Sequence, residues 1–212
     1  MTKIICSGLT VFFLLLLTGC SNLTSLFFYP QQEYLRTPND INLTYEDVKT
    51  HAVDGTEINS WFLPAQVEGT EADDSPIVLF LHGNAENISA HIGSVYWLPE
   101  QGVNVFLLDY RGFGHSKGDP YIPAIFEDVE SSLIWLRERF PERKIFVLGQ
   151  SIGSAIATTS MALFKDEYQL SGLILDASFT GYRDIAQDVT GSHVITWLVW
   201  PFTWLLSTEW DP

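Results

Sequence analysis

The chain has 212 residues and is 46% hydrophobic, which is enough for one sizeable buried core and favours a single main domain. Its formal net charge is -15 at pH 7. A surface this acidic repels phosphate backbones, so the composition argues against a nucleic-acid partner.

The first 19 residues have the pattern of a targeting segment. Lys3 supplies a positive charge, and the uncharged apolar stretch from Leu9 to Leu17 follows it. This stretch is too short for a confident membrane span. The next residues, LTGC from Leu17 to Cys20, resemble the lipobox of bacterial lipoproteins, in which cleavage precedes the cysteine. The alternative is an ordinary signal peptide that happens to contain a cysteine.

The lipobox resemblance implies a lipid-anchored protein of the bacterial cell envelope. Cys20 would become the first mature residue and carry a diacylglyceryl group, which tethers the domain to a membrane. Cys6 would leave with the signal peptide, so no thiol would remain for disulfides or for cysteine-based metal or redox chemistry. In lipoproteins, an aspartate after the cysteine favours the inner membrane. Ser21 occupies this position, so the outer membrane is favoured.

Residues 20–40 are interpreted as a lipidated tether that becomes a docking segment, with apolar contacts from Phe27, Phe28 and Tyr29. The predicted main domain follows from 41 to 212. It opens with two alternating stretches around VDGT (53–56), and an Asp-Gly pair between such stretches predicts a β-hairpin. The polar, acidic segment 67–76 predicts a loop.

From Pro76 onward, continuous apolar runs alternate with segments of helical length. Such runs, rich in valine and leucine, are typical of strands covered on both faces. The predicted strands are IVLFLHG (77–83), VNVFLLDY (103–110), KIFVLG (144–149) and LSGLILDA (170–177). The segments of helical length are 88–100, 122–140 and 152–165. This alternation predicts an α/β fold with a doubly wound, mostly parallel sheet.

The segment 122–140 shows the clearest helical periodicity. Its apolar residues recur at spacings near three and four, with acidic residues early and basic residues late, as the helix dipole favours. These apolar residues are Ile125, Val129, Leu133, Leu136 and Phe140.

The candidate chemical residues all follow predicted strands, and ligands of such sheets bind beyond the carboxyl ends of the strands. The most specific motif is GQSIG, with Gly149, Ser151 and Gly153 between a strand and a helix. A serine in this pattern is typical of a nucleophile elbow, a strained strand-to-helix turn that needs small neighbours.

Three motifs in this order resemble the α/β-hydrolase family, in particular its small esterase-like and thioesterase-like members. They are the HGN turn (82–84), the loop DYRGFGHS (109–116) and the elbow GQSIG (149–153). The resemblance covers about Phe28 to the C-terminus. It implies that Ser151 is the nucleophile and that the backbone N–H groups of Asn84 and Ile152 bind the oxyanion. The helix that begins near Ser151 suits this role, because it presents unpaired N–H groups.

Other residues in these motifs have structural interpretations as well. The resemblance implies that His82 braces its turn; the alternative is a catalytic base. Asp109, Arg111 and His115 are expected to order the loop after their strand, with Asp109 and Arg111 able to pair. Direct contact of His115 with substrate is the alternative there. Ser151 itself could be a simple turn serine.

A serine nucleophile needs a histidine, and in this family the chain order is serine, acid, histidine. After Ser151 the sequence has His193 alone, which precedes an apolar, tryptophan-rich run. Asp176 could serve as the acid, or could shape the end of its strand. The family resemblance, however, implies an acid after a seventh strand and a histidine after an eighth, where most members carry them. The expected position of both groups is therefore beyond Pro212, within about 55 further residues.

The C-terminal part carries two further expectations. A domain that ends at Pro212 would lack its last strands and helices and leave the strand 170–177 as a sheet edge. The apolar run 194–206 is shorter than a bilayer span, so we expect a buried or lid helix within 190–210. Its tryptophans, together with Trp210, could line an acyl pocket or touch the membrane.

The leading interpretation is a lipid-anchored serine hydrolase that cleaves an ester or thioester by acyl transfer through Ser151. The alternative is a catalytically inactive lipoprotein with a hydrolase fold, either a binding protein or a decayed product. A dehalogenase-like enzyme is disfavoured, because its elbow would carry aspartate at position 151. The sequence has no metal cluster, phosphate loop or dinucleotide motif, so we expect no cofactor.

Overall fold

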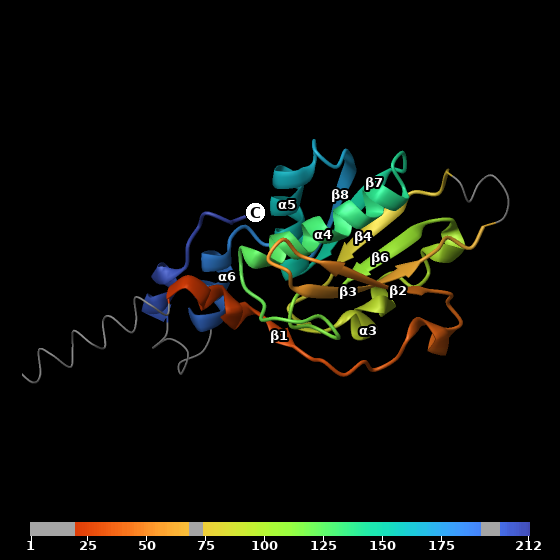
Figure 1. Ribbon diagram of the computed structural model, residues 1–212. Coiled ribbons are helices and arrows are strands. Elements are labelled where there is room, and N and C mark those ends of the chain that lie inside the picture. The colour runs from red at the N-terminus through yellow and green to blue at the C-terminus, as the bar shows by residue number, and fades with distance from the viewer. Residues whose placement is uncertain (1–19, 68–73, 192–199) are drawn as a thin grey trace, which may run out of the picture.

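The computed structural model describes residues 20–67, 74–191 and 200–212 (Figure 1). The strands are β1 (Tyr29–Pro30), β2 (Glu46–His51), β3 (Glu57–Leu63), β4 (Ile77–Leu81), β5 (Ala85–Glu86), β6 (Asn104–Leu108), β7 (Ile145–Gln150) and β8 (Leu170–Asp176). The α-helices are α3 (Ile88–His91), α4 (Ala124–Arg139), α5 (Ile152–Phe164) and α6 (Tyr182–Gly191). The 3-10 helices are η1 (Cys20–Phe27), η2 (Pro38–Ile41), η3 (Ile92–Ser94), η4 (Pro99–Gln101) and η6 (Trp200–Leu205).

Within the described residues, six strands form one mixed sheet in the order β2-β3-β6-β4-β7-β8. The strands β6, β4, β7 and β8 are parallel to one another. At the other side of the sheet, β3 is antiparallel to both β6 and β2. The predicted doubly wound, mostly parallel sheet is therefore confirmed, as is the hairpin around VDGT. In a parallel sheet the carboxyl ends of the strands meet at one edge, and this brings the sequence motifs together.

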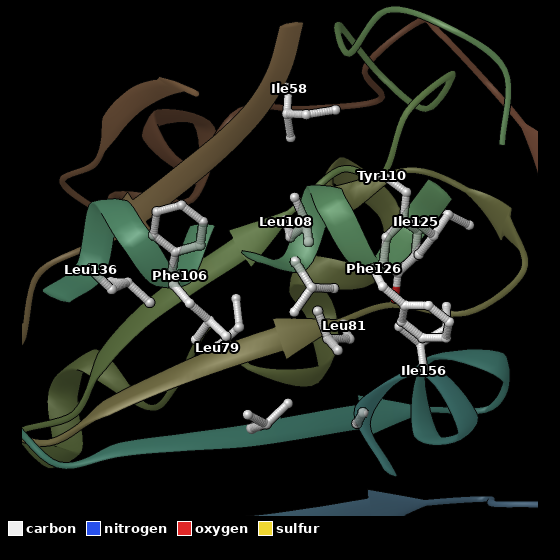
Figure 2. Close-up of a cluster of buried hydrophobic side chains, with 14 of the residues drawn as sticks. Ile58, Leu79, Leu81, Phe106, Leu108, Tyr110, Ile125, Phe126, Leu136 and Ile156 are labelled. Atoms are coloured by element: carbon white, nitrogen blue, oxygen red, sulfur yellow. The ribbon is translucent and has the colours of Figure 1, made fainter. Parts of the chain in front are cut away.

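The two faces of the sheet pack against different parts of the chain. Alternate residues of β4 and β6, such as Leu79 and Phe106, enter one core with the helices α4 and α5 (Figure 2). The residues between them, such as Phe80 and Leu107, enter a second core with α3 and its flanking segments. Burial on both faces explains why these strands are continuous apolar runs.

The helix α4 carries the predicted apolar face. Ile125, Val129, Leu133 and Leu136 are fully buried, and Phe140 forms its C-cap. The segment 88–100 differs from the expected helix, since α3 ends at His91 and only short 3-10 turns follow. Gly93 weakens a helix in this segment, and Pro99 lacks the N–H that a continuing helix would need.

Two of the three aromatic residues at 27–29 make the expected apolar contacts. Phe28 is buried against Phe113, and Phe27 packs on Tyr182. The expectation was wrong for Tyr29, a residue that is 62% exposed. Its backbone makes the contact instead: β1 pairs in parallel with β5, and the N–H of Tyr29 donates to the carbonyl of Asn84 at 2.7 Å. The chain after the tether therefore lies beside the HGN turn.

The strand β8 lies at the edge of the sheet, as expected. Ile174 and Leu175 in its second half are 47% and 44% exposed. Large exposed apolar side chains on an edge strand favour association or aggregation.

The C-terminal segment is described from Trp200 onward, so His193 and Trp197 lie outside the described residues. In the described part, Trp200 begins the 3-10 helix η6, and the ring of Trp210 packs against Phe126, with 5.3 Å between ring centroids. No helix in the described ranges has the length and apolar character that crossing a bilayer requires.

Candidate active site

Ser151 lies at a tight turn between β7 and α5. Its backbone has φ 55° and ψ −121°, a conformation that L-residues other than glycine rarely adopt. The N–H of Ser151 donates to the carbonyl of Asp176 at 2.8 Å, and its own carbonyl accepts from the N–H of Ser154 at 2.8 Å. These bonds hold a strained turn at the carboxyl edge of the sheet, where the side chain is partly exposed.

Both glycines of the motif lie too close to backbone to carry a side chain. A Cβ at Gly149 would overlap the carbonyl of Gly153. A Cβ at Gly153 would overlap the carbonyl oxygens of Leu81 and His82, at the end of β4. The glycines therefore let α5 start directly against the neighbouring strand, and the turn at Ser151 depends on this close packing.

The hydroxyl of Ser154 stabilises the turn through hydrogen bonds to two backbone carbonyls. It is fully buried and lies 2.7 Å from the carbonyl of Gly149 and 2.9 Å from that of Asp176. The backbone carbonyl of Asp176 thus faces both Ser151 and Ser154, and the end of β8 positions the elbow.

The HGN turn lies beside the elbow. A Cβ built on Gly83 would be 3.9 Å from the Cβ of Ser151. In the described part of the chain, the backbone N–H groups of Asn84 and Ile152 donate no hydrogen bond. Two unpaired donors on the two segments that meet at Ser151 form an arrangement that can bind an oxyanion.

His82 is buried beneath this turn. Its Nδ1 lies 2.8 Å from the carbonyl of Gly83, and its ring packs against Tyr110, Phe113 and His91. Burial and the neighbouring His91 lower the pKa of His82 to about 3. A ring that is neutral and enclosed by other rings agrees with the bracing role.

Asp109 and Arg111 both stabilise the loop after β6, but the expectation that they pair was wrong. Asp109 accepts from the hydroxyl of Tyr34 at 2.9 Å and from the N–H of Ile88 at 2.8 Å. Arg111 instead pairs with Asp128 of α4. The two side chains diverge because Asp109 faces α3, on one side of the sheet, while Arg111 faces α4 on the other.

His115 lines a polar cleft of about 270 Å³ with Gln32, Glu33 and Lys117 among its neighbours. Its ring packs on Tyr34, with 4.2 Å between ring centroids. Among the described residues, no hydrogen bond or ring contact joins His115 to the elbow. Both interpretations of His115 stay predictions.

The carboxylate of Asp176 is exposed and accepts from the side-chain amide of Gln150 at 3.0 Å. Gln150 in turn contacts His91 of α3, whose Nδ1 lies 3.1 Å from Oε1 of Gln150. The amino-acid sequence does not by itself mark Gln150 or His91 as site residues. The one feature that could have pointed to them is their position: Gln150 lies inside the elbow motif, and His91 lies shortly after the HGN turn.

The buried side chains of His82 and Asp109 lead to a testable prediction about how the stability of the fold depends on pH. Their Nε2 and Oδ1 atoms are 3.6 Å apart. Burial raises the pKa of Asp109 to about 7, partly offset by the N–H of Ile88 and the hydroxyl of Tyr34. His82 binds fewer protons folded than unfolded between about pH 3 and 6.5, so alone it makes stability rise with pH. Asp109 binds more protons folded than unfolded between about pH 4 and 7, so alone it makes stability fall.

In the wild type these two slopes cancel between about pH 4 and 6.5. Relative to wild type, we expect the unfolding free energy of Asp109→Asn to rise by up to about 1.4 kcal/mol per pH unit in this window. For His82→Gln, the unfolding free energy relative to wild type should fall with increasing pH by the same amount per unit. Urea unfolding at several pH values, followed by tryptophan fluorescence, measures both. Parallel pH profiles for the two variants would contradict this account.

Comparison with known proteins identifies a matching family and several relatives. The family described as "Serine aminopeptidase, S33" (Hydrolase_4) matches residues 72–208. The "Uncharacterized protein YfhR" of Salmonella typhimurium is 36% identical over 179 residues, covering 78% of this chain and 59% of that protein. The "Lysophosphatidylserine lipase ABHD12" of Rattus norvegicus is 31% identical over 167 residues, covering 74% of this chain and 42% of that protein. The chain therefore spans about three fifths or less of the length of these relatives.

Solved structures share the fold at low sequence identity. The Pyrococcus furiosus esterase Pf2001 superposes with a TM-score of 0.66 at 22% identity, covering 85% of this chain and 70% of that one. A thermostable carboxyl esterase from Bacillus coagulans gives a TM-score of 0.56 at 21% identity, covering 71% and 50% of the two chains. The α/β-hydrolase fold is thus shown by the sheet and by these neighbours. Because the family match extends over more than half of the chain, the protein belongs to the serine aminopeptidase (S33) family of α/β-hydrolases.

Proposed function

We propose that the protein is a serine hydrolase that cleaves an ester or thioester by acyl transfer through Ser151. The observation that carries this proposal is the backbone of Ser151, held at φ 55° between two glycines that admit no Cβ. Such strain needs support from the surrounding structure, and it is typical of sites where the strained residue has a function. The names of the relatives, an esterase and a lysophosphatidylserine lipase among them, favour an ester of an acyl chain as the substrate class.

The proposed reaction begins with attack of the Ser151 Oγ on the carbonyl carbon of the substrate, while a base removes the hydroxyl proton. The carbonyl oxygen becomes an oxyanion, which accepts hydrogen bonds from the N–H groups of Asn84 and Ile152. Collapse of this intermediate expels the alcohol or thiol, which takes the proton from the base. Water then attacks the acyl-serine by the same route, releasing the acid and restoring Ser151.

We place the base and its acid in the whole protein beyond Pro212. Within the described residues, no imidazole makes a hydrogen bond to the hydroxyl of Ser151. His82 is enclosed and bonded to the carbonyl of Gly83, while the ring nitrogens of His91 face Gln150 and Ala85. The carboxylate of Asp176 is already hydrogen-bonded to Gln150, and His193 remains the weaker candidate for the base.

Labelling with a fluorophosphonate tests the nucleophile, because only an activated serine reacts quickly. In the protein as its native gene encodes it, we expect labelling of the wild type and none of Ser151→Ala. Ester hydrolysis should fall by on the order of 10⁶-fold, the loss seen when a nucleophilic serine is removed from a triad. Ser178→Ala changes an exposed serine after β8 and should keep wild-type labelling.

Two results would overturn the assignment. Labelling that survives Ser151→Ala would place the reactive serine elsewhere. A natively encoded protein that is folded but unlabelled would favour the inactive, binding alternative.

We further propose that the protein is anchored to the outer membrane through lipid on Cys20. The arrangement near α6 supports a membrane-facing side. Phe27, at the end of the helix that begins with Cys20, packs on Tyr182, and Arg183 lies over the ring of Trp204. Trp204 is 60% exposed, and exposed tryptophan beside a cation suits the lipid headgroup region.

The anchor predicts that cells expressing the protein incorporate labelled palmitate into it. Cys20→Ala should lose this label and remain unprocessed, whereas Cys6→Ala should incorporate it normally. Normal processing of Cys20→Ala without any label in the wild type would indicate an ordinary signal peptide.

A further inference from the structure

His91 links the two segments that carry the proposed oxyanion donors. Its Nε2 lies 3.0 Å from the carbonyl of Ala85, the residue after Asn84. Its Nδ1 lies 3.1 Å from Oε1 of Gln150, the residue before Ser151. The edge of the same ring would be 3.1 Å from a Cβ built on Gly83, so it also packs against the turn itself. One side chain therefore spans the gap between the HGN turn and the elbow.

The hydrogen-bond partners determine which atoms carry protons. The carboxylate of Asp176 only accepts hydrogen bonds, so the Gln150 atom that faces it at 3.0 Å is the amide nitrogen. The oxygen of the Gln150 amide then faces Nδ1 of His91 and must accept from it. The carbonyl of Ala85 must likewise accept from Nε2. Both bonds form together only when both ring nitrogens of His91 carry a proton.

The charged and titratable groups around this ring agree with a cation there. His82 stacks on His91 with 5.2 Å between centroids and an interplanar angle of 25°, and its lowered pKa keeps it neutral. Asp109 lies 3.6 Å from Nε2 of His82. The carboxylate of Asp176 is separated from His91 by the side-chain amide of Gln150, which donates to it. Glu86 follows Ala85 in β5. Ser94, within 3.5 Å of the Gln150 amide, adds a neutral hydroxyl.

We propose that His91 is a positioning residue, doubly protonated, that holds the Asn84 amide against the Ile152 amide. The relay runs from the Asp176 carboxylate through Gln150 and His91 to the carbonyl of Ala85. These hydrogen bonds keep the backbone N–H groups of Asn84 and Ile152, which belong to separate segments, directed toward the same oxyanion position. This inference rests on the proposed function, because the positions of these two N–H groups matter for catalysis only if an oxyanion forms beside Ser151.

Nuclear magnetic resonance of protein labelled with ¹⁵N-histidine tests the protonation without any enzymatic activity. At neutral pH we expect both ring nitrogens of His91 to give the chemical shift of protonated nitrogen. In Gln150→Leu, which removes the acceptor at Nδ1, one of these protons should be lost at the same pH. A single-proton ring in the wild type, or a spectrum that Gln150→Leu leaves unchanged, would overturn the proposal.

The positioning role is tested by kinetics on the natively encoded protein. His91→Phe keeps a ring for stacking but makes neither hydrogen bond. We expect kcat to fall by about 100-fold, as for a small misplacement of catalytic groups, with KM nearly unchanged. His91→Gln, which can still donate one bond, should recover part of the loss. His51→Phe, an exposed histidine in β2, is the matched control.

These results separate the two proposals. If Ser151→Ala retains activity, the proposed function fails, while the spectrum of His91 still reports its protonation. If Ser151→Ala is inactive but His91→Phe keeps wild-type kcat, the nucleophile stands and the positioning role is wrong. An equal loss of kcat in His91→Phe and His51→Phe would also overturn the role.

Discussion

Gly153→Ala is expected to lower the free energy of unfolding by about 3 kcal/mol, at the upper end of the usual cost of overpacking. The added Cβ would overlap two backbone carbonyl oxygens, those of Leu81 and His82. Backbone at the end of a central strand cannot move aside as a flexible side chain can. Alanine is the better helix former by about 1 kcal/mol, so helix propensity acts against this loss and cannot explain it.

Gly93→Ala is the control for this substitution. Gly93 lies in the short helix η3, and a Cβ there would meet no atom within 4 Å. We expect its unfolding free energy to stay within about 1 kcal/mol of wild type. Urea unfolding of both variants measures the difference. If both variants are equally stable, α5 does not pack on β4 as closely as the structure has it.

Arg111→Met is expected to cost about 3–5 kcal/mol, the range for removing one partner of a buried ion pair. The side chain of Arg111 is 3% exposed and that of Asp128 is fully buried, with 2.7 Å between Nη2 and Oδ1. Burial raises the pKa of Asp128 to about 6, and the hydrogen bond and charge of Arg111 hold this rise in check. Methionine would fill much of the volume but leave the carboxylate without its cation.

A second variant separates the charge from the packing. In Arg111→Met with Asp128→Asn, no buried charge remains unpaired, so we expect part of the lost stability to return. Lys49→Met provides the contrast: the side chain of Lys49 pairs with Glu57 but is 59% exposed, and solvent screens such a pair, so this substitution should cost much less stability than Arg111→Met. If the double variant is as unstable as Arg111→Met, the loss comes from packing and the ion-pair account is wrong.

The strands and the elbow were predictable because their signals are local. The apolar run at 77–83 reports burial on both faces of a strand, and the Asp-Gly pair at 54–55 reports a tight turn. The spacing of Gly149, Ser151 and Gly153 identifies a strained strand-to-helix turn from five residues alone. In each case the physical cause acts over a few neighbouring residues, so the sequence records it directly.

Other features depended on segments far apart in the chain. The choice of Asp128 over Asp109 as the partner of Arg111 follows from the side of the sheet that each residue faces. The relay through His91 and Gln150 joins α3 to the carboxyl ends of β7 and β8, which are neighbours only after the sheet has formed.

The amino-acid sequence by itself determined the fold class, the order of the parallel strands along the chain and the position of Ser151 in its motif. Only the tertiary structure decided which side chains meet at the carboxyl edge of the sheet. The physical reason is that hydrophobic periodicity records how each element is buried, whereas hydrogen-bond and ion-pair partners depend on atomic distances of about 3 Å between elements. These distances are set by how the strands pair and how closely glycines such as Gly153 let a helix approach them.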